Sequence, residues 1–132
     1  MATITTDIHL DAEPADAWDA VRDFAAVHER VAAGFVVASR TEGRDRVIRF
    51  ANGAEARERL VTLDDEHWRL VYSVVESSLA LRHHQASVEV MDADGGGTRF
   101  VWTADVLPDD AAPTIEAMMA QGAAAIARTI RR

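Results

Sequence analysis

Three side chains in the middle of the chain have types that could act together on a small molecule: Glu58, Tyr72 and His84. A carboxylate, a phenol and an imidazole can orient a ligand's carbonyl or hydroxyl group, or transfer a proton during enolisation or aldol cyclisation. Residues two apart on a strand share one face. If Leu60 points inward, so does Glu58, and if Val88 points inward, so does His84. We therefore predict a polar cluster on the inner face of a sheet.

Each candidate also has a simpler interpretation. Glu58 could be a charge at the mouth of a cavity, bonded to a neighbouring Arg, and Tyr72 could be a core aromatic residue whose hydroxyl is satisfied. His83 and His84 are adjacent, so they point to opposite faces of a strand and make a poor metal site. We therefore expect neither a bound metal nor a cofactor.

The elements that must position these side chains follow from hydrophobic periodicity. Residues 2–10 alternate with a period of two, which predicts a half-buried strand. Pro14 precedes an apolar stripe at helical spacing, which predicts a helix over about residues 14–26. Asn52-Gly53 is typical of a tight hairpin turn. Six further strands are predicted, at residues 35–41, 46–51, 55–63, 68–76, 82–91 and 99–107.

The C-terminal segment carries a long apolar stripe from Ile115 to Ile130, which predicts a helix that begins near Asp109. Strands joined by short turns must be antiparallel, and one curved sheet can cover its buried face with this helix. The predicted fold class is therefore α+β, a curved antiparallel sheet of about six to seven strands wrapped around the long C-terminal helix, with a cavity between them. Gly122 interrupts the stripe at a cost of about 1 kcal/mol relative to Ala. It either makes room for a ligand or lets the helix approach the sheet closely.

Composition and charge restrict the class of protein. The 132 residues are 48% hydrophobic and 27% charged, which is typical of one globular domain over residues 1–132. A net charge of −8 disfavours nucleic acid and anionic membranes as partners. The absence of Cys excludes disulfides and thiolate metal sites. Residues 1–10 alternate polar and apolar side chains, so we do not expect them to form a signal peptide, and no window approaches the roughly 20 apolar residues of a membrane span. We expect a bacterial cytoplasmic protein without stable membrane insertion, either a monomer or a dimer.

Several segments together resemble the polyketide cyclase/dehydratase branch of the SRPBCC superfamily. The N-terminal ones are Ile8-His9-Leu10-Asp11-Ala12-Glu13-Pro14, Trp18 and Val21-Arg22-Asp23-Phe24, and the middle ones are Arg57-Glu58-Arg59-Leu60, Tyr72-Ser73-Val74-Val75-Glu76 and residues 97–102. The resemblance implies the helix-grip fold of the START lipid-transfer domains, the birch pollen allergen and the plant abscisic acid receptors. In those receptors the matching Glu faces the ligand, which implies the same for Glu58, and an inward aromatic residue matches Tyr72. The tight hairpin at Asn52-Gly53 departs from their longer gating loop.

Three functions remain open. The first is binding of a small hydrophobic ligand, lipid-like or aromatic and polyketide-like, between the sheet and the C-terminal helix. The second is an enzyme of the polyketide cyclase or dehydratase type, with Glu58 or His84 as acid or base and Tyr72 beside them. The third is a protein-interaction module without a ligand, which requires a filled core. For the first, the expected ligand-binding residues are Ala56, Glu58, Tyr72, Val74, His84, Ala86, Trp102, Met118, Met119 and Gly122.

Overall fold

The protein, described over residues 1–132 by a computed structural model, is one seven-stranded antiparallel sheet with helices against it. The strands are β1 (Ala2–Leu10), β2 (Val36–Glu42), β3 (Asp45–Phe50), β4 (Glu55–Asp64), β5 (Arg69–Ser77), β6 (His83–Asp92) and β7 (Thr98–Leu107). The helices are α1 (Pro14–Arg22), α2 (Val27–Arg30) and α3 (Ala112–Thr129), with short 3₁₀ turns η1 (Phe24–Ala26) and η2 (Asp109–Ala111). The predicted α+β helix-grip class is confirmed.

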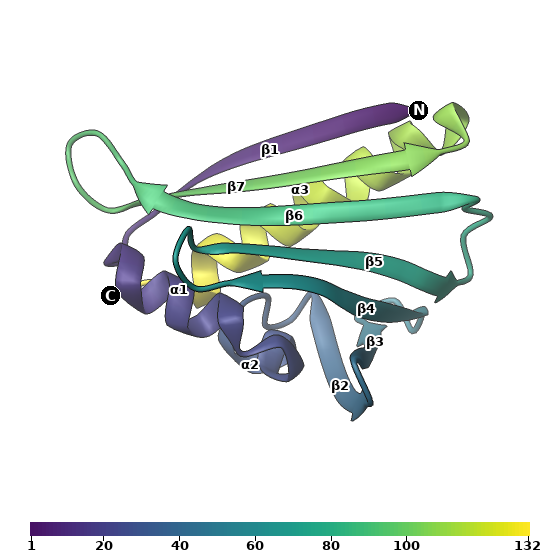
Figure 1. Ribbon diagram of the computed structural model, residues 1–132, viewed down its shortest axis with the longest axis horizontal. Coiled ribbons are helices and arrows are strands. Elements are labelled where there is room, and N and C mark those ends of the chain that lie inside the picture. Colours follow the sequence, from purple (N-terminus) through teal and green to yellow (C-terminus); the bar gives the residue numbers. More distant parts are fainter.

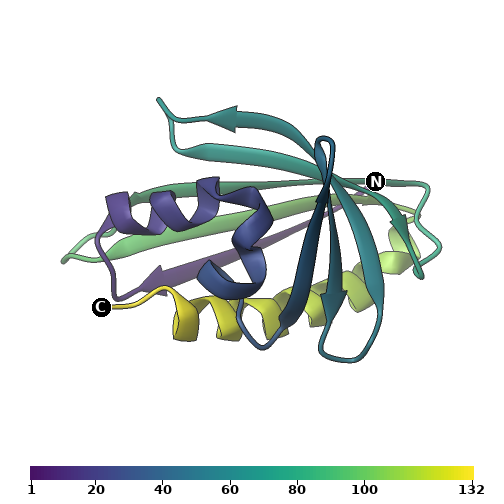
Figure 2. The same ribbon diagram turned by 90° about the horizontal axis from the view of Figure 1, so that it is seen from below.

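The sheet has the order β1-β7-β6-β5-β4-β3-β2, so β1 and β2 are its edges. Figure 1 shows α3 crossing behind the strands, while α1 and α2 lie at one end of the sheet. Figure 2 shows β2, β3 and β4 curling toward α3. Register shifts between Arg57 and Glu58 and between Leu60 and Thr62 interrupt the β4–β5 pairing. Such bulges increase the local twist of a sheet, which accounts for the curl.

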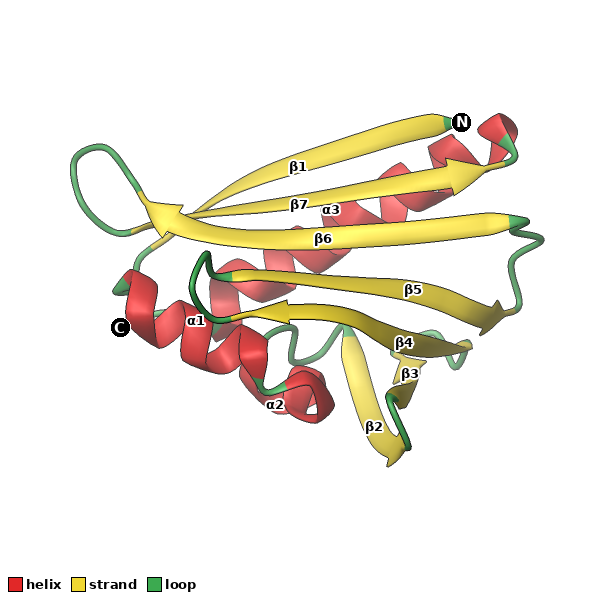
Figure 3. Ribbon diagram, in the orientation of Figure 1, coloured by secondary structure: helices red, strands yellow, loops and turns green.

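The core lies between the inner face of the sheet and the helices, which are red in Figure 3. Phe100 and Val106 of β7 are almost fully buried, as the alternation of inward and outward residues requires. The helix α3 turns one face toward them, formed by Ile115, Met119, Gly122, Ala125 and Ile126. No helix combines the length and the apolar character that a transmembrane helix needs.

At Gly122 the helix α3 lies close to a side chain of the sheet. A Cβ atom at this position would lie 2.9 Å from Cζ3 and 3.0 Å from Cη2 of Trp102. Of the two roles expected for this glycine, the structure therefore shows close approach, because the indole of Trp102 fills the space that a side chain would need.

The first helix is shorter than the sequence predicts. It ends at Arg22 rather than near residue 26, because Asp23 has a ψ of 74° that no helix continues. The chain then forms η1 and α2. The carbonyl oxygen of Phe24 accepts a hydrogen bond from Nη1 of Arg46 at 2.9 Å, so a side chain of the sheet satisfies this backbone group.

The hairpin at Asn52-Gly53 has the predicted position. The amide of Phe50 donates to the carbonyl of Ala54 at 2.8 Å, and Gly53 has a φ of 89°, which favours glycine. This tight connection fixes the β3–β4 register and so decides which residues of the two strands face the core together.

Candidate functional site

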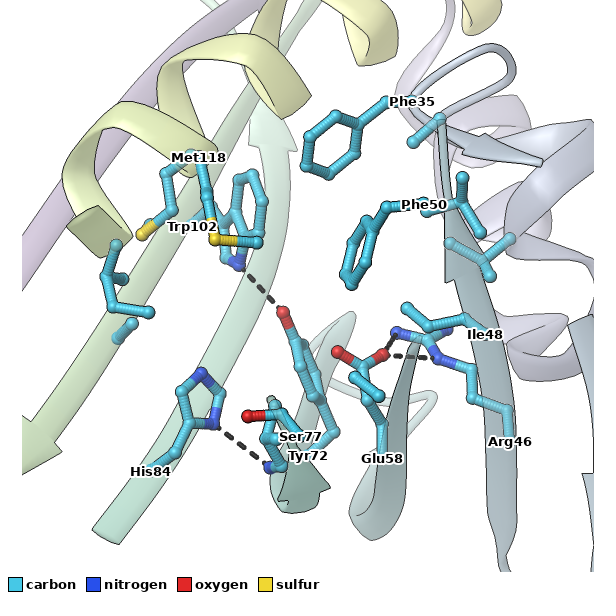
Figure 4. Close-up of a pocket in the computed structure, with 18 of the residues that line it drawn as sticks. Phe35, Arg46, Ile48, Phe50, Glu58, Tyr72, Ser77, His84, Trp102 and Met118 are labelled. Carbon is cyan, nitrogen blue, oxygen red and sulfur yellow. Dashed lines mark hydrogen bonds and ion pairs between the residues drawn. The ribbon is translucent and has the colours of Figure 1, made fainter. Parts of the chain in front are cut away.

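A cavity of about 310 Å³ lies between the inner face of the sheet and α3. Of its 31 lining residues, 23 are hydrophobic, so most of the wall is apolar. Figure 4 shows the rings of Phe35 and Phe50 on one side and Met118 and Trp102 on the other. Lining residues that are also exposed mark the mouth: Asn52 and Glu55 of the β3–β4 hairpin, Ser77 at the end of β5, Ser78 after it, and Thr114 of α3.

One part of the wall is charged. Arg46 of β3 lies directly opposite Glu58 of β4, and both side chains point inward. Nε and Nη2 of Arg46 each lie 2.8 Å from Oε1 of Glu58. The two side chains are only 9% and 7% exposed, so this is a buried ion pair. The second carboxylate oxygen, Oε2, accepts no hydrogen bond from the protein and is available to a ligand.

The guanidinium of Arg46 also contacts two aromatic rings and a backbone oxygen. Its central carbon lies 3.9 Å from the centre of the Phe24 ring and 5.2 Å from that of Tyr72. Guanidinium groups are attracted to the faces of aromatic rings, and more strongly where water is excluded. Nη1 donates to the backbone oxygen of Phe24. Arg46 therefore links Phe24, which follows α1, to the cavity wall. It also pairs its positive charge with the Glu58 carboxylate through Oε1.

Tyr72 presents a hydroxyl group to the cavity. Its oxygen accepts a hydrogen bond from Nε1 of Trp102 at 3.1 Å (Figure 4). The hydroxyl proton has no acceptor in the protein. Burial, and to a smaller extent the negative charge of Glu58, raise the pKa of Tyr72, so the phenol stays protonated. Tyr72 is thus a neutral hydrogen-bond donor with a fixed oxygen.

His84 presents a second donor. Its Nδ1 accepts a hydrogen bond from the backbone amide of Val74 at 3.1 Å, so in the neutral ring the proton must lie on Nε2. Burial lowers the pKa of His84, with the charge of Glu58 opposing this shift, so the neutral form is favoured. Nε2 has no partner in the protein. The rings of Tyr72 and His84 are adjacent, with centroids 5.9 Å apart.

The structure brings together most of the residues that the sequence singled out. The cavity wall contains eight of them: Ala56, Glu58, Tyr72, Val74, His84, Trp102, Met118 and Met119. Ala86 and Gly122 lie outside it. Ala86 has the inward parity of His84 but is 1% exposed and lies opposite Tyr72 within the core, while Gly122 is covered by Trp102.

The sequence offered an Arg beside Glu58 as one interpretation, but it did not identify Arg46 as that residue, and it missed the aromatic residues Phe24, Phe35 and Phe50. A signal for Arg46 was present, because it shares the inward parity of Ile48 and Phe50 and a charged residue on an apolar face needs a partner. Phe24 contacts the guanidinium only because α1 ends early. Phe35 precedes β2, where no alternation fixes its direction.

The arrangement provides two neutral donors, Tyr72 O–H and His84 Nε2–H, and one acceptor, Glu58 Oε2. These three groups can orient a polar oxygen of a ligand, and Glu58 is the group among them that could accept a proton. No three His, Cys, Asp or Glu side chains gather at a position that could hold a metal ion. His84 acts as a donor in this geometry, because its other nitrogen is occupied by the backbone.

Solved structures with this fold include several bacterial proteins. The chain is similar to the protein XoxI from Bacillus cereus, with a TM-score of 0.87 and 18% identity over 98% of this chain and 96% of that one. It is also similar to an uncharacterized protein from Bacillus thuringiensis, with a TM-score of 0.86 and 17% identity over 98% of both chains. A Thermobifida fusca protein solved by NMR shares 29% identity over 93% of this chain and 85% of that one, with a TM-score of 0.74.

A search of curated proteins gives no match. The family model described as polyketide cyclase / dehydrase and lipid transport matches residues 1–131, nearly the whole chain. This family lies within the SRPBCC superfamily, whose ligand-binding fold agrees with the cavity between sheet and α3. The chain belongs to the polyketide cyclase/dehydrase and lipid transport family.

Proposed function

We propose that this protein binds a small hydrophobic molecule in the cavity between the sheet and α3. The observation that carries the proposal is the cavity itself, about 310 Å³ with a predominantly apolar wall and three polar groups, Tyr72 O–H, His84 Nε2–H and Glu58 Oε2, that can still bond to a ligand. Protein interiors normally pack without voids of this size. An apolar space of this kind, with a few polar groups directed into it, is the usual form of a ligand site.

The volume restricts the size of the ligand. Ligand pockets span roughly 300–1,000 Å³, so this one is at the lower end. A dry cavity of about 150 Å³ accommodates benzene, and a space of about 310 Å³ therefore suits a molecule with two fused rings. A long acyl chain does not fit without extending through the mouth between the β3–β4 hairpin and α3.

A matched pair of variants on α3 tests the proposal. Met118 lines the cavity and is half-buried, whereas Ala117 is exposed on the same helix. Met118→Trp fills the cavity, and Ala117→Trp adds the same ring outside it. With naphthalene as probe in isothermal titration calorimetry, we expect saturable binding to the wild type and to Ala117→Trp, and no binding to Met118→Trp. Equal binding to all three proteins would place the ligand elsewhere and refute the proposal.

A second candidate function is proton transfer on a bound ketone. It rests on one observation, the Oε2 atom of Glu58, which faces the cavity without a partner beside the donors of Tyr72 and His84. In this arrangement Glu58 is the base, and the two donors stabilise the oxygen of the enolate that forms. Glu58→Gln should then abolish exchange of the α-hydrogens of a bound ketone into D₂O and leave its affinity nearly intact. Equal loss of both would leave Glu58 a binding residue only.

The interaction module without a ligand has less support. It requires a filled core, which the cavity does not provide. The exposed large hydrophobic residues of the strands are Val37, Val61, Leu63 and Val75, which are 37% to 49% exposed. A few exposed apolar side chains of this kind are normal in monomeric proteins.

A further inference from the structure

The polar end of the cavity contains two hydrogen-bond donors and a carboxylate. Two donors, the hydroxyl of Tyr72 and Nε2–H of His84, have no protein partner, although both side chains are buried, at 6% and 7% exposure. Each donor is fixed by a bond made through its other polar atom, to Trp102 for Tyr72 and to the amide of Val74 for His84. Both donors therefore face the cavity with a free hydrogen-bonding direction, and a ligand oxygen that accepts from both would complete their hydrogen bonding.

A negative charge lies beside these donors, because Glu58 is next to Tyr72 in the cavity wall and its oxygen Oε2 is free (Figure 4). The Glu58 carboxylate affects the pKa of Tyr72 more strongly than the Arg46 guanidinium does, and Glu58 is also the charge that acts most on His84. Arg46 offers a ligand anion no free donor, because Nε and Nη2 are bonded to Glu58 and Nη1 to the backbone of Phe24. An anion placed against Tyr72 and His84 therefore meets a like charge in a site with little water. A neutral acceptor does not.

Resting on the proposed binding function, we propose that the cavity selects a neutral ligand with a ketone-type carbonyl, held by Tyr72 O–H and His84 Nε2–H, and rejects the carboxylate of the same shape. Figure 4 shows the geometry, with the hydroxyl of Tyr72 and the free ring nitrogen of His84 both directed toward Trp102 and Met118, and Glu58 on the other side of Tyr72. The ligand class is thus an aromatic or alicyclic ketone, in contrast to a fatty acid or an aromatic acid.

Three two-ring compounds separate this proposal from the binding function. Naphthalene tests the cavity alone, 2-acetylnaphthalene adds a neutral carbonyl, and 2-naphthoate replaces that group with a carboxylate of nearly the same shape. Because a net hydrogen bond contributes about 1 kcal/mol and 1.4 kcal/mol is tenfold in affinity, we expect the ketone to bind about tenfold or more tightly than naphthalene. The carboxylate is expected to bind at least about tenfold more weakly than the ketone, because desolvating a charge beside a like charge is unfavourable.

The roles of Tyr72 and His84 are tested by substituting each residue and measuring, for each variant, the ratio of its affinity for the ketone to its affinity for naphthalene. This ratio is insensitive to a general loss of stability, because both ligands need the same folded cavity. Tyr72→Phe should reduce the ratio toward one, and His84→Phe provides a second, independent variant. Ser87→Ala is the matched control, since it removes a hydroxyl from the outer face of β6 that makes no hydrogen bond in the protein and lies outside the cavity wall, and the ratio should not change.

The outcomes are distinct. A higher affinity for the ketone that is lost in Tyr72→Phe and His84→Phe, but kept in Ser87→Ala, supports the proposal. Naphthalene binding without any advantage for the ketone overturns it and leaves the binding function in place. Equal affinity for ketone and carboxylate overturns the selection for a neutral group. Failure of all three compounds to bind overturns both proposals.

Discussion

Arg46 and Glu58 form an ion pair at 2.8 Å within the wall of an apolar cavity, from positions directly opposite each other on β3 and β4. The pair uses one carboxylate oxygen and leaves the other free. Its geometry follows from the Asn52-Gly53 hairpin, which sets the register of the two strands. The turn that joins β3 to β4 thereby determines where the carboxylate of Glu58 lies in the cavity wall.

Removing Arg46 should destabilise the protein strongly. Arg46→Met leaves Glu58 as a buried charge without a partner, which costs about 3–5 kcal/mol in the free energy of unfolding. The double variant Arg46→Met/Glu58→Leu should recover much of the loss, because two apolar side chains can replace a buried pair. Urea unfolding measures both. Arg49→Ala is the control, since Arg49 pairs with Glu55 on the surface at 3.0 Å and its loss should cost less than about 1 kcal/mol. Equal effects of the two Arg substitutions would contradict the assigned role.

Gly122→Ala should destabilise α3 despite the higher helix propensity of Ala. The new methyl group would lie about 3 Å from the far edge of the Trp102 indole, and overpacking of this kind costs about 1–3 kcal/mol. The gain in propensity is about 1 kcal/mol. Thermal or urea unfolding should therefore show a net loss of up to about 2 kcal/mol. Ala124→Gly, on the exposed side of the same helix, isolates the propensity effect, and a stabilised Gly122→Ala protein would show that Trp102 can move away.

Low pH should lower the free energy of unfolding, because His84 is buried in its neutral form. Burial lowers the pKa of His84 below its usual value of 6.5, although the negative charges of Glu58 and Asp105 oppose the shift, and the neighbouring charge of His83 adds to it. The unfolded chain then binds more protons than the folded one at this position, so the free energy of unfolding falls as the pH decreases below about 6.5. The pH dependence of urea unfolding should be shallower in His84→Gln. An NMR titration in which the His84 ring protonates at or above pH 6.5 would contradict this prediction.

Asp45 should contribute to acid stability on the outer face of the sheet. Its carboxylate accepts hydrogen bonds from Arg59 at 2.8 and 3.1 Å and from Arg57 at 2.9 Å, which lower the pKa of Asp45 from 3.8 to about 2. Because the folded pKa is the lower one, the stabilisation is present above pH 3.8 and is lost as the pH falls toward 2. Asp45→Asn should lose part of the pH dependence in this range, measured by urea unfolding. The exposed Asp16, which forms no ion pair, provides the control Asp16→Asn, and equal slopes for the two variants would argue against the Asp45 network.

The sequence was sufficient for the fold and for the inward direction of Glu58, Tyr72 and His84, because alternation along a strand and the turn at Asn52-Gly53 are local properties. It was not sufficient for the partner of Glu58. The choice of Arg46 depends on strand register, and its stacking on Phe24 depends on the early end of α1, where a backbone carbonyl bonds to a distant side chain. These are long-range relationships that local patterns do not record.

The role of Gly122 was left open for a similar reason. A glycine in an apolar stripe is compatible with a ligand or with a close neighbour, and only the position of the Trp102 ring decides between them. The tautomer of His84 likewise follows from the Val74 amide on the adjacent strand, which sequence alone does not place at 3.1 Å.

The most direct test of the central claim is a ¹H–¹⁵N NMR titration of the protein with 2-acetylnaphthalene. The indole N–H of Trp102 and the amide of Val74 are bonded to the two groups expected to bind the carbonyl, Tyr72 and His84. We predict saturable shifts at both signals, and none at Val61 or Val75, which are exposed. Saturable shifts confined to those exposed residues, or no saturable shift at Trp102 and Val74, would contradict the claim that the cavity between the sheet and α3 is the binding site.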